Sequence, residues 1–575
     1  MDHFKQRGAP LVATFSHKRK CFMSAQDSNL SSTGFDYVVA VTQDSVNSTL
    51  EEYLYSGLPE VILCYVYNED FQPIPIDFAT FVTGAGNTDP FSVPDGTEPS
   101  DARVQNLSNA NFAFAIKVKL GLPPGVDPAS LLPIIALKPG QSYVTYTLMF
   151  GEFVATEITY GPHGPVAWFN ESQPSGTCWS FSGPVDLNFQ DASFASLPSD
   201  VQERLKGIGD PDMFGVQQLY YDLNSSDLEQ GFQFNRIPSN SALNDFMTSD
   251  FINTYWKELG GAEILGYAAT QVTPTQSSSL AVTDVNFFTP DAVGGDNAPL
   301  TLNYLCATDN DQLPDTTHAG FGWNWIEPGE VSQYDGVAAL NRNAFANYLL
   351  NTDNNGQSLA AYIQGNCQRP EVTVQCSGQE AENFYMYFFP GDPTITCPPS
   401  GPVILSCNYT STISDKCGGP LLGGSIQITI TYDITVSVQG DTMTIAQHLV
   451  GYTYISDQGS SDGGNVVDKS VTDVYTIGVN DTGQIVAALQ SSTPVDNSKT
   501  PGVNGFLNWF TNINDLLNWA TGAVRGCTGT SFADVPVSFL QNFVFPGGSS
   551  FVFNDAVFSD NQDLVGHITY ADPTL

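Results

Sequence analysis

The sequence predicts a mainly β protein of the α+β class, in which a few long amphipathic helices pack against long, curved antiparallel sheets. The first observation is the stretch 425–438, SIQITITYDITVSV, where every second residue is apolar. The second is that further alternating or apolar runs occur in both halves of the chain. The third is that only a few segments have helical periodicity, the longest being 502–526. One-sided strands and one-sided helices stabilise each other by covering each other's apolar faces.

The alternating stretch at 425–438 predicts an unusually long strand. Successive side chains of a strand point to opposite faces, and thirteen residues would span roughly 40 Å. One face is then wholly apolar, while Gln, Thr, Asp and Ser form the other. The apolar side chains are candidates for lining a ligand groove: Ile426, Ile428, Ile430, Tyr432, Ile434, Val436 and Val438.

Other strands are expected where apolar residues alternate or form short runs between turn residues. The segment 142–160 is read as a pair of strands or as one bent strand. A turn is expected at 480–483, NDTG, within the predicted strand segment 471–490. The predicted strands lie within 61–67, 111–120, 142–160, 448–455, 471–490 and 549–558.

Helices are expected where apolar residues recur every three or four positions, at 44–57, 241–261, 336–350 and 502–526. The last is the strongest, because its apolar stripe continues over some six turns between Pro501 and Gly526. Such a stripe is typical of core and could also contact an acyl chain. Its groove candidates are Phe506, Phe510, Ile513 and Leu517.

The charge is strongly acidic, with 60 acidic and 19 basic residues in 575 and a formal net charge of −41. A surface of this sign repels phosphate backbones, so nucleic acid is not expected as a partner. No apolar run reaches the length of a membrane-spanning helix. The first twenty residues lack the apolar core of a secretory signal, which predicts a cytoplasmic or unconventionally secreted protein. The sequence implies no particular oligomeric state.

Cysteines are concentrated in one region, since five of the ten lie between 367 and 417. This region contains no Cys-x-x-Cys pair and no histidine, which argues against zinc. One or two disulfides are expected there instead, and no metal site is predicted.

No catalytic residues and no cofactor are predicted, and the protein is not expected to be an enzyme. The stretch 459–463, GSSDG, matches the Gly-x-Ser-x-Gly pattern of hydrolases. A nucleophile elbow needs a buried strand before the serine and a helix after it, whereas both flanks here are polar. A loop between two strands is therefore the preferred interpretation. The six histidines are scattered, and structural roles are expected for His448 and His567.

The chain is predicted to contain a basic disordered tail at 1–25 and two β-rich domains, 26–265 and 266–575. The boundary is placed near the polar run TQVTPTQSSS, which follows the predicted helix 241–261. The second domain contains the cysteine-rich region 367–417.

Two segments near the ends of the chain resemble a known family. Residues 32–50, STGFDYVVAVTQDSVNSTL, contain Phe35-Asp36 before an apolar run and Val46-Asn47 within a predicted helix. Residues 539–573 contain Phe545-Pro546-Gly547-Gly548 and the strand-like Asp563-Leu564-Val565. Both are similar to the forty-seven-kilodalton proteins of clostridial neurotoxin gene clusters, although Phe35 stands where that family typically has Trp. The cysteine-rich region has no counterpart in this pattern.

The resemblance implies a tubular lipid-binding (TULIP) fold, which that family shares with the OrfX proteins. In this fold a long curved sheet wraps a long helix, with an apolar groove between them, and both predicted domains would be TULIP-like. The expected function is non-enzymatic binding of a lipid or another apolar small molecule in that groove. A toxin-complex or pore-associated component that inserts a hairpin into membranes is the first alternative. A structural or assembly protein is the second.

Overall fold

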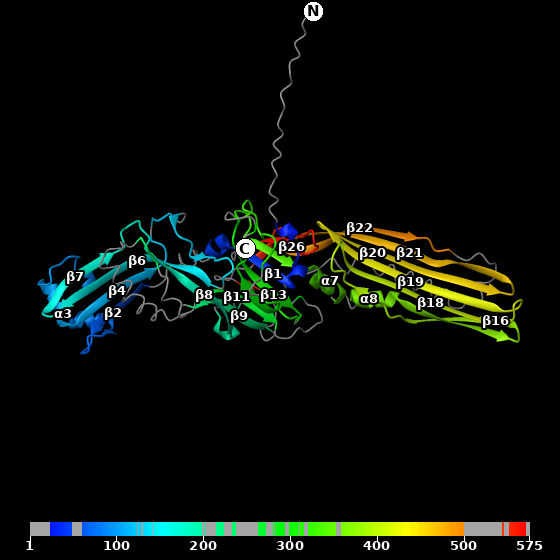
Figure 1. Ribbon diagram of the computed structural model, residues 1–575, viewed down its shortest axis with the longest axis horizontal. Coiled ribbons are helices and arrows are strands. Elements are labelled where there is room, and N and C mark those ends of the chain that lie inside the picture. Colours follow the sequence, from blue (N-terminus) through cyan, green and yellow to red (C-terminus); the bar gives the residue numbers. More distant parts are fainter. Residues whose placement is uncertain are drawn as a thin grey trace, which may run out of the picture.

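The computed structural model describes most of the chain between residues 24 and 570. The described residues are 24–48, 60–123, 125–127, 130–141, 143–197, 202, 214–222, 233–236, 263–271, 280, 282–291, 293, 298–309, 311–315, 320–351, 358–499, 543–544 and 551–570. Three large sheets follow one another along the long axis of an elongated molecule, and a two-stranded sheet lies beside the last of them (Figure 1). The protein is mainly β, its sheets are antiparallel and its helices are few, as the sequence predicts.

The sheet at one end is built around one very long strand, β6 (Tyr143–Gly161). The first part of β6 pairs with β8, and the remainder pairs with β4 and β7, so a single strand joins two parts of the sheet. Of the two interpretations of 142–160, the single strand is therefore correct. The other strands are β2 (Glu60–Tyr67), β3 (Pro73–Pro75), β4 (Phe112–Leu120), β5 (Ile135–Ala136), β7 (Gly164–Ser172), β8 (Ser180–Ala192), β9 (Phe214–Asp222), β10 (Gln233–Asn235), β11 (Glu263–Gln271) and β23 (Phe543–Val544).

Two short helices cover this first sheet, α2 (Phe78–Gly84) and α3 (Ala102–Asn109). Each begins at an aspartate that accepts a hydrogen bond from a backbone N–H of the first turn, Asp77 from Thr80 and Asp101 from Arg103. Single-turn helices occur at η1 (Ala25–Asp27), η2 (Leu30–Ser32), η3 (Pro90–Ser92) and η5 (Phe194–Ser196).

The central sheet joins distant parts of the chain. Its strands follow the order β12 (Val282–Phe288), β13 (Thr301–Thr308), β1 (Tyr37–Thr42), β14 (Gly336–Leu340), β26 (Leu564–Tyr570) and β24 (Phe551–Phe553), and β25 (Val557–Phe558) also pairs with β26. All residues of β1, β13 and β14 are buried. This sheet therefore combines β1, from the first predicted domain, with strands from the second.

A buried polar junction holds the central sheet to its surroundings. Asp563, at the start of β26, accepts hydrogen bonds from the Ser28 hydroxyl and from the backbone N–H groups of Leu30 and Arg342. The Arg342 guanidinium donates to the Gln562 side chain and to the Val403 carbonyl, each at 2.7 Å. The junction ties the beginning and end of the described chain to the third sheet.

The third sheet, which we call the long sheet, has the order β17 (Ile395–Thr396), β18 (Val403–Cys417), β19 (Gly424–Gln439), β20 (Thr442–Asp457), β21 (Ser460–Val479) and β22 (Ile485–Asp496). The helices α7 (Arg342–Asn351) and α8 (Leu359–Asn366) and the hairpin of β15 (Gln368–Ser377) and β16 (Glu380–Pro390) complete this end (Figure 1). The expected turn at 480–483 is confirmed, because it joins β21 to β22.

The helix predictions have mixed outcomes. The expected helix at 336–350 is wrong in its first five residues, which form β14 between β1 and β26, and α7 begins only at Arg342. Pairing on both sides stabilises a strand here despite the helical spacing of the apolar residues. Residues 43–48 are helical, whereas the rest of 44–57 and the predicted helices 241–261 and 502–526 lie outside the described residues. No described helix is long and apolar enough to cross a membrane.

Candidate ligand-binding face of the long sheet

One face of the long sheet is a buried and mainly apolar surface, which we call the inner wall. The seven β19 residues predicted to line a groove all lie on it, and each is at most 1% exposed. Neighbouring strands contribute further buried side chains, which are apolar except for Gln447 and Asp473. The inner wall consists of Leu405 and Cys407 of β18; Ile426, Ile428, Ile430, Tyr432, Ile434, Val436 and Val438 of β19; Met443, Ile445, Gln447 and Leu449 of β20; and Val471, Asp473, Tyr475 and Ile477 of β21.

The inner wall is continuous because the strands pair in a register that keeps apolar positions opposite each other. Val436, for example, pairs with Leu405 on one side and Ile445 on the other. The β19–β20 register is fixed by a two-residue turn, Gly440-Asp441, in which Gly440 has φ of +59°. Such turns favour glycine, since other residues adopt positive φ at a cost. Burial alternates along β20 without a break, and polar Gln447 takes one of its buried positions.

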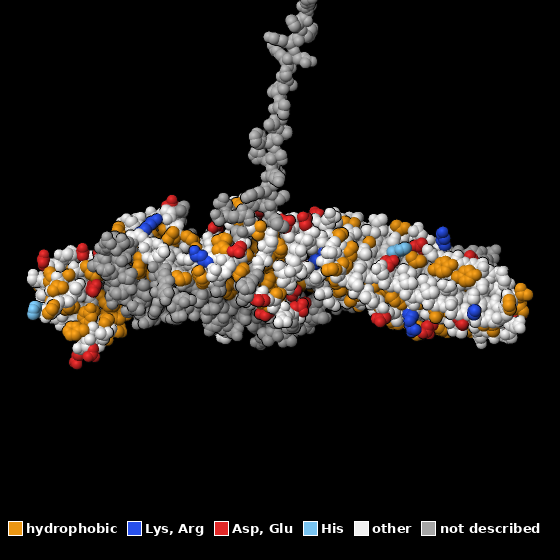
Figure 2. Space-filling view, viewed as in Figure 1, with side chains coloured by type: hydrophobic (Ala, Val, Ile, Leu, Met, Phe, Trp, Pro, Cys, Tyr) orange, Lys and Arg blue, Asp and Glu red, His pale blue; other side chains and the backbone are white. Residues whose placement is uncertain are grey.

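The opposite face of the long sheet is polar. Hydroxyl pairs cross neighbouring strands, including Thr412 with Thr429 at 2.9 Å and Ser425 with Ser456 at 2.8 Å. In Figure 2 the visible surface of this end of the molecule is mostly backbone and side chains that are neither hydrophobic nor charged, with some hydrophobic side chains among them. The two faces thus differ as sharply as the sequence predicts.

Described elements cover the part of the inner wall formed by β18 and β19. The β15–β16 hairpin packs against both strands. At Gly424 the approach is so close that a Cβ would lie 2.7 Å from Ala381 Cβ and 2.8 Å from the Phe384 ring, which explains the glycine. Where the long sheet meets the central sheet, the Phe558 N–H donates to the Gly440 carbonyl, and the Phe558 ring packs against Phe345 of α7.

Polar side chains interrupt the inner wall at two places that the sequence analysis did not identify. The Tyr432 hydroxyl donates to Gln447 Oε1 at 2.7 Å across β19 and β20. Asp473 of β21 is 0% exposed, and its pKa is raised because burial penalises the charged carboxylate, an effect that Ser492 on β22 partly offsets. The sequence signal for a buried Asp473 is the alternation of Val471, Asp473 and Tyr475, because it places the aspartate on the same side of the strand as its two apolar neighbours.

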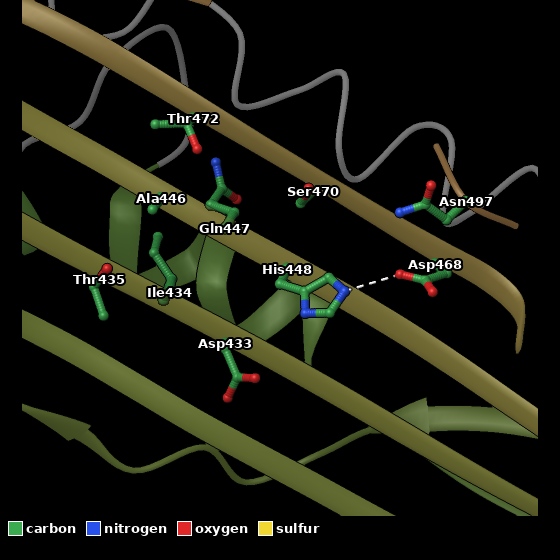
Figure 3. Close-up of a pocket in the computed structure, with 10 residues that line it drawn as sticks. All are labelled: Asp433, Ile434, Thr435, Ala446, Gln447, His448, Asp468, Ser470, Thr472 and Asn497. Carbon is green, nitrogen blue, oxygen red and sulfur yellow. Dashed lines mark hydrogen bonds and ion pairs between the residues drawn. The ribbon is translucent and has the colours of Figure 1, made fainter. Parts of the chain in front are cut away.

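The polar face has a shallow depression of about 680 Å³ over β19, β20 and β21 (Figure 3). Its centre is His448, whose Nε2 lies 2.9 Å from Asp468 Oδ1. The hydrogen bond from His448, together with one from Asn465, lowers the pKa of Asp468. Asp433, on the other side of the histidine, accepts a hydrogen bond from Asn408 at 2.7 Å. The depression is open, and its charged groups, His448, Asp468 and Asp433, each have a hydrogen-bond partner, so it resembles an ordinary polar surface.

The residues considered for chemistry have structural roles. Residues 459–463 form the turn and first pairs of the β20–β21 hairpin, so the serine-hydrolase pattern is not a nucleophile elbow. His448 Nε2 lies 2.9 Å from Asp468, and His567 Nδ1 lies 2.8 Å from Asp555, so each imidazole has a carboxylate partner. Within the described part of the chain, no group of three or more His, Cys, Asp or Glu side chains is arranged to hold a metal ion.

The cysteine-rich region contains one disulfide, Cys376–Cys417, in agreement with the sequence prediction of one or two. It joins the end of β15 to the end of β18 and so fastens the hairpin to the long sheet. The remaining groove candidates, Phe506, Phe510, Ile513 and Leu517, lie outside the described residues.

The chain was compared with known proteins by sequence and by structure, and only the structural comparison gave matches. No protein-family model and no curated protein matches the sequence. Among solved structures, the chain resembles P47 of Clostridium botulinum E1, with 9% identity, a TM-score of 0.42 and coverage of 93% of this chain and 98% of P47. It also resembles a lipopolysaccharide binding protein, with 9% identity, a TM-score of 0.24 and coverage of 93% and 99%.

Proposed function

We propose that this protein binds a lipid or another apolar ligand against the inner wall of the long sheet and does not convert it chemically. The observation that carries this proposal is the uninterrupted apolar row of seven side chains on β19, continued by the inner side chains of β18, β20 and β21. An apolar surface of this length offers an extended contact to an acyl chain, with about 25 cal/mol for each Å² of apolar area buried.

Ligand entry requires the cover of the inner wall to move, because the wall side chains are buried by protein. Of the described elements, the β15–β16 hairpin lies on β18 and β19, where the Cys376–Cys417 disulfide fastens it, so on this proposal the cover that moves lies over β20 and β21. The Tyr432–Gln447 pair and Asp473 are the polar groups available to orient a polar end of the ligand.

A membrane-inserting hairpin is less well supported. Insertion of β19 and β20 would require their apolar sides to face lipid, whereas both strands turn these sides toward the protein interior. The polar sides carry threonines, serines and charged groups in hydrogen-bonded pairs. Leakage of dye from liposomes on addition of the protein would favour this alternative.

The test is to extract the purified full-length protein with organic solvent and to identify apolar compounds by mass spectrometry. The extracted protein is then titrated with a fluorescent fatty acid. We expect a co-purifying lipid or saturable uptake of the probe. Failure of both would refute the proposal.

Two matched variants locate the binding surface. Ile434→Trp enlarges a side chain of the inner wall, whereas Thr435→Trp adds the same ring to the polar face one residue away. We expect the first variant to weaken probe binding and the second to leave it unchanged, with circular dichroism used to select conditions in which both are folded. Equal binding by both variants would place the ligand elsewhere.

A further inference from the structure

The thiols of Cys367 and Cys407 lie together at the opposite end of the β15–β18 contact from the Cys376–Cys417 disulfide. Cys367 is the last residue before β15 and is 0% exposed, while Cys407 is on β18 and is 1% exposed. Their side chains interact directly with each other. Neither cysteine is in a disulfide in the structure.

Strands β15 and β18 run in the same direction with a nearly constant offset. The existing disulfide joins residues 41 positions apart, Cys376 and Cys417. The Val374 N–H donates to Asp415 Oδ2 at 2.7 Å, again between residues 41 positions apart. Cys367 and Cys407 continue this alignment to the start of β15, since they are 40 positions apart instead of 41.

The chain around Cys367 is held firmly against β18. The Gly391 N–H, just after β16, donates to the Cys367 carbonyl at 2.7 Å. A Cβ on Gly391 would collide with both that carbonyl and the Tyr409 hydroxyl, so no side chain separates the two segments there. Tyr409 follows Cys407 by two residues on β18, which places the Cys367 backbone beside this part of the strand.

From this alignment we propose that Cys367 and Cys407 form a second disulfide, which fastens the beginning of β15 to β18 as Cys376–Cys417 fastens its end. The two bonds would enclose a short ring containing most of β15, and the hairpin would be held over the inner wall at both ends. The proposal does not depend on what the inner wall binds.

The reaction is a thiol–disulfide exchange with a low-molecular-weight disulfide such as oxidised glutathione. The Cys407 thiolate attacks a sulfur of the oxidant and releases one thiolate. The Cys367 thiolate then attacks the Cys407 sulfur of the mixed disulfide and releases the second thiolate. Two protein S–H bonds are lost and one S–S bond forms, while the oxidant is reduced to two thiols and accepts both protons.

The burial of the two thiols sets the conditions in which the bond can form. In the folded protein, burial raises the pKa of both thiols, and their mutual interaction further raises the pKa of Cys367 but opposes the increase at Cys407. Few thiolates are therefore available once the hairpin has closed. Because both sulfurs are buried, we expect the bond to form while the hairpin is still open, during folding.

The test is to refold the denatured, reduced full-length protein at pH 8.5 in a glutathione redox buffer. Remaining thiols are alkylated in denaturant, and the linked peptides are identified by mass spectrometry. We expect a Cys367–Cys407 peptide in addition to Cys376–Cys417. Alkylation of both Cys367 and Cys407 in a protein that contains the Cys376–Cys417 bond would overturn the proposal.

Cys397 supplies the matched control, because it lies in the same region and is also a free thiol. Cys397→Ser should leave the Cys367–Cys407 peptide intact, whereas Cys407→Ser should leave Cys367 fully alkylated. A Cys397–Cys407 peptide in the wild type would contradict the pairing.

The proposed effect of the second disulfide, which is to hold the β15–β16 hairpin on the long sheet, is measured separately by hydrogen exchange. The second bond should slow hydrogen exchange of residues 368–390 at least several-fold relative to Cys407→Ser, with exchange in β20 unchanged. Equal exchange in residues 368–390 would overturn the fastening role even if the bond forms.

Discussion

The central sheet and the long sheet bury their apolar side chains in different ways. Strands β1, β13 and β14 are buried throughout, with one apolar cluster on each side of the sheet. In the long sheet, β19 and β20 bury alternate residues and keep their other face polar. The first arrangement makes a structural centre, while the second leaves one extended apolar surface whose cover could be exchanged for a ligand.

This difference also predicts which substitutions lower the stability of each sheet most. The central sheet depends on a few buried polar groups that join separate segments, Asp563 and Arg342 above all. The long sheet distributes its stability over many equivalent apolar side chains. Mutations should therefore have larger individual effects at the junction than on the inner wall.

The largest expected effect comes from Asp563→Ala. This change leaves the Ser28 hydroxyl and two backbone N–H groups without their acceptor and removes the negative charge next to Arg342. We expect a loss of about 3–5 kcal/mol in the free energy of unfolding, measured by chemical denaturation. Asp560→Ala, at an exposed position three residues earlier, should change it little. Similar small losses from both would contradict the importance of the junction.

The next largest expected effect is a difference in stability loss between substitutions on the two faces of the long sheet. Ile430→Ala removes a fully buried side chain of the inner wall and should cost about 2–4 kcal/mol. Thr431→Ala changes the neighbouring position on the polar face and should cost no more than about 0.5 kcal/mol. Thermal or chemical unfolding of the two variants measures the contrast, and equal losses would show that the faces are not distinct energetically.

Asp473→Asn should stabilise the protein at pH 7 by roughly 1–3 kcal/mol, because it removes a charge from an apolar surface. Burial raises the pKa of this carboxyl in the folded state. The folded protein therefore holds its proton more tightly than the unfolded chain, and the wild type loses stability as pH rises from the unfolded pKa through the folded pKa. The advantage of the variant should disappear near pH 3. A variant that is less stable at pH 7 would contradict this account.

The smallest expected effect concerns His567 in the central sheet. Burial disfavours its charge, but Asp555 and Glu330 outweigh this and raise its pKa. The imidazolium therefore stabilises the fold below the unfolded pKa, and this contribution is lost as pH rises through the folded pKa. Relative to wild type, His567→Asn should lose about 0.5–1 kcal/mol at pH 5.5 and recover part of it at pH 9. His163→Asn, at an exposed position, is the control; a loss that does not depend on pH would contradict the ion-pair role.

The same comparison explains how far the sequence could predict the structure. The alternation at 425–438 predicted β19 and its buried side chains, since burial on one face alone leaves a period of two in the sequence. The segment GVAAL at 336–340 was mistaken for helix, because a strand buried on both faces has no alternation to reveal it. The pairing of β1 with β13 and β14 was also not predictable, because it depends on contacts between residues more than 250 positions apart.

For the candidate site, the sequence identified the apolar row of β19 but not the polar groups within the inner wall. Gln447 is a polar residue at an inner position of β20, where the Tyr432 hydroxyl donates to it. Asp473 was not distinguished from the many other carboxylates. Only the strand register reveals which of them is buried.

The central claim is that the inner wall contacts an apolar ligand. A fatty acid carrying a photoactivatable diazirine, crosslinked to the full-length protein and mapped by peptide mass spectrometry, tests it most directly. The account predicts labels within 403–479 on inner-wall residues such as Ile430, Ile434 and Ile445. Labels confined to the polar face of the long sheet or to the first sheet would contradict it.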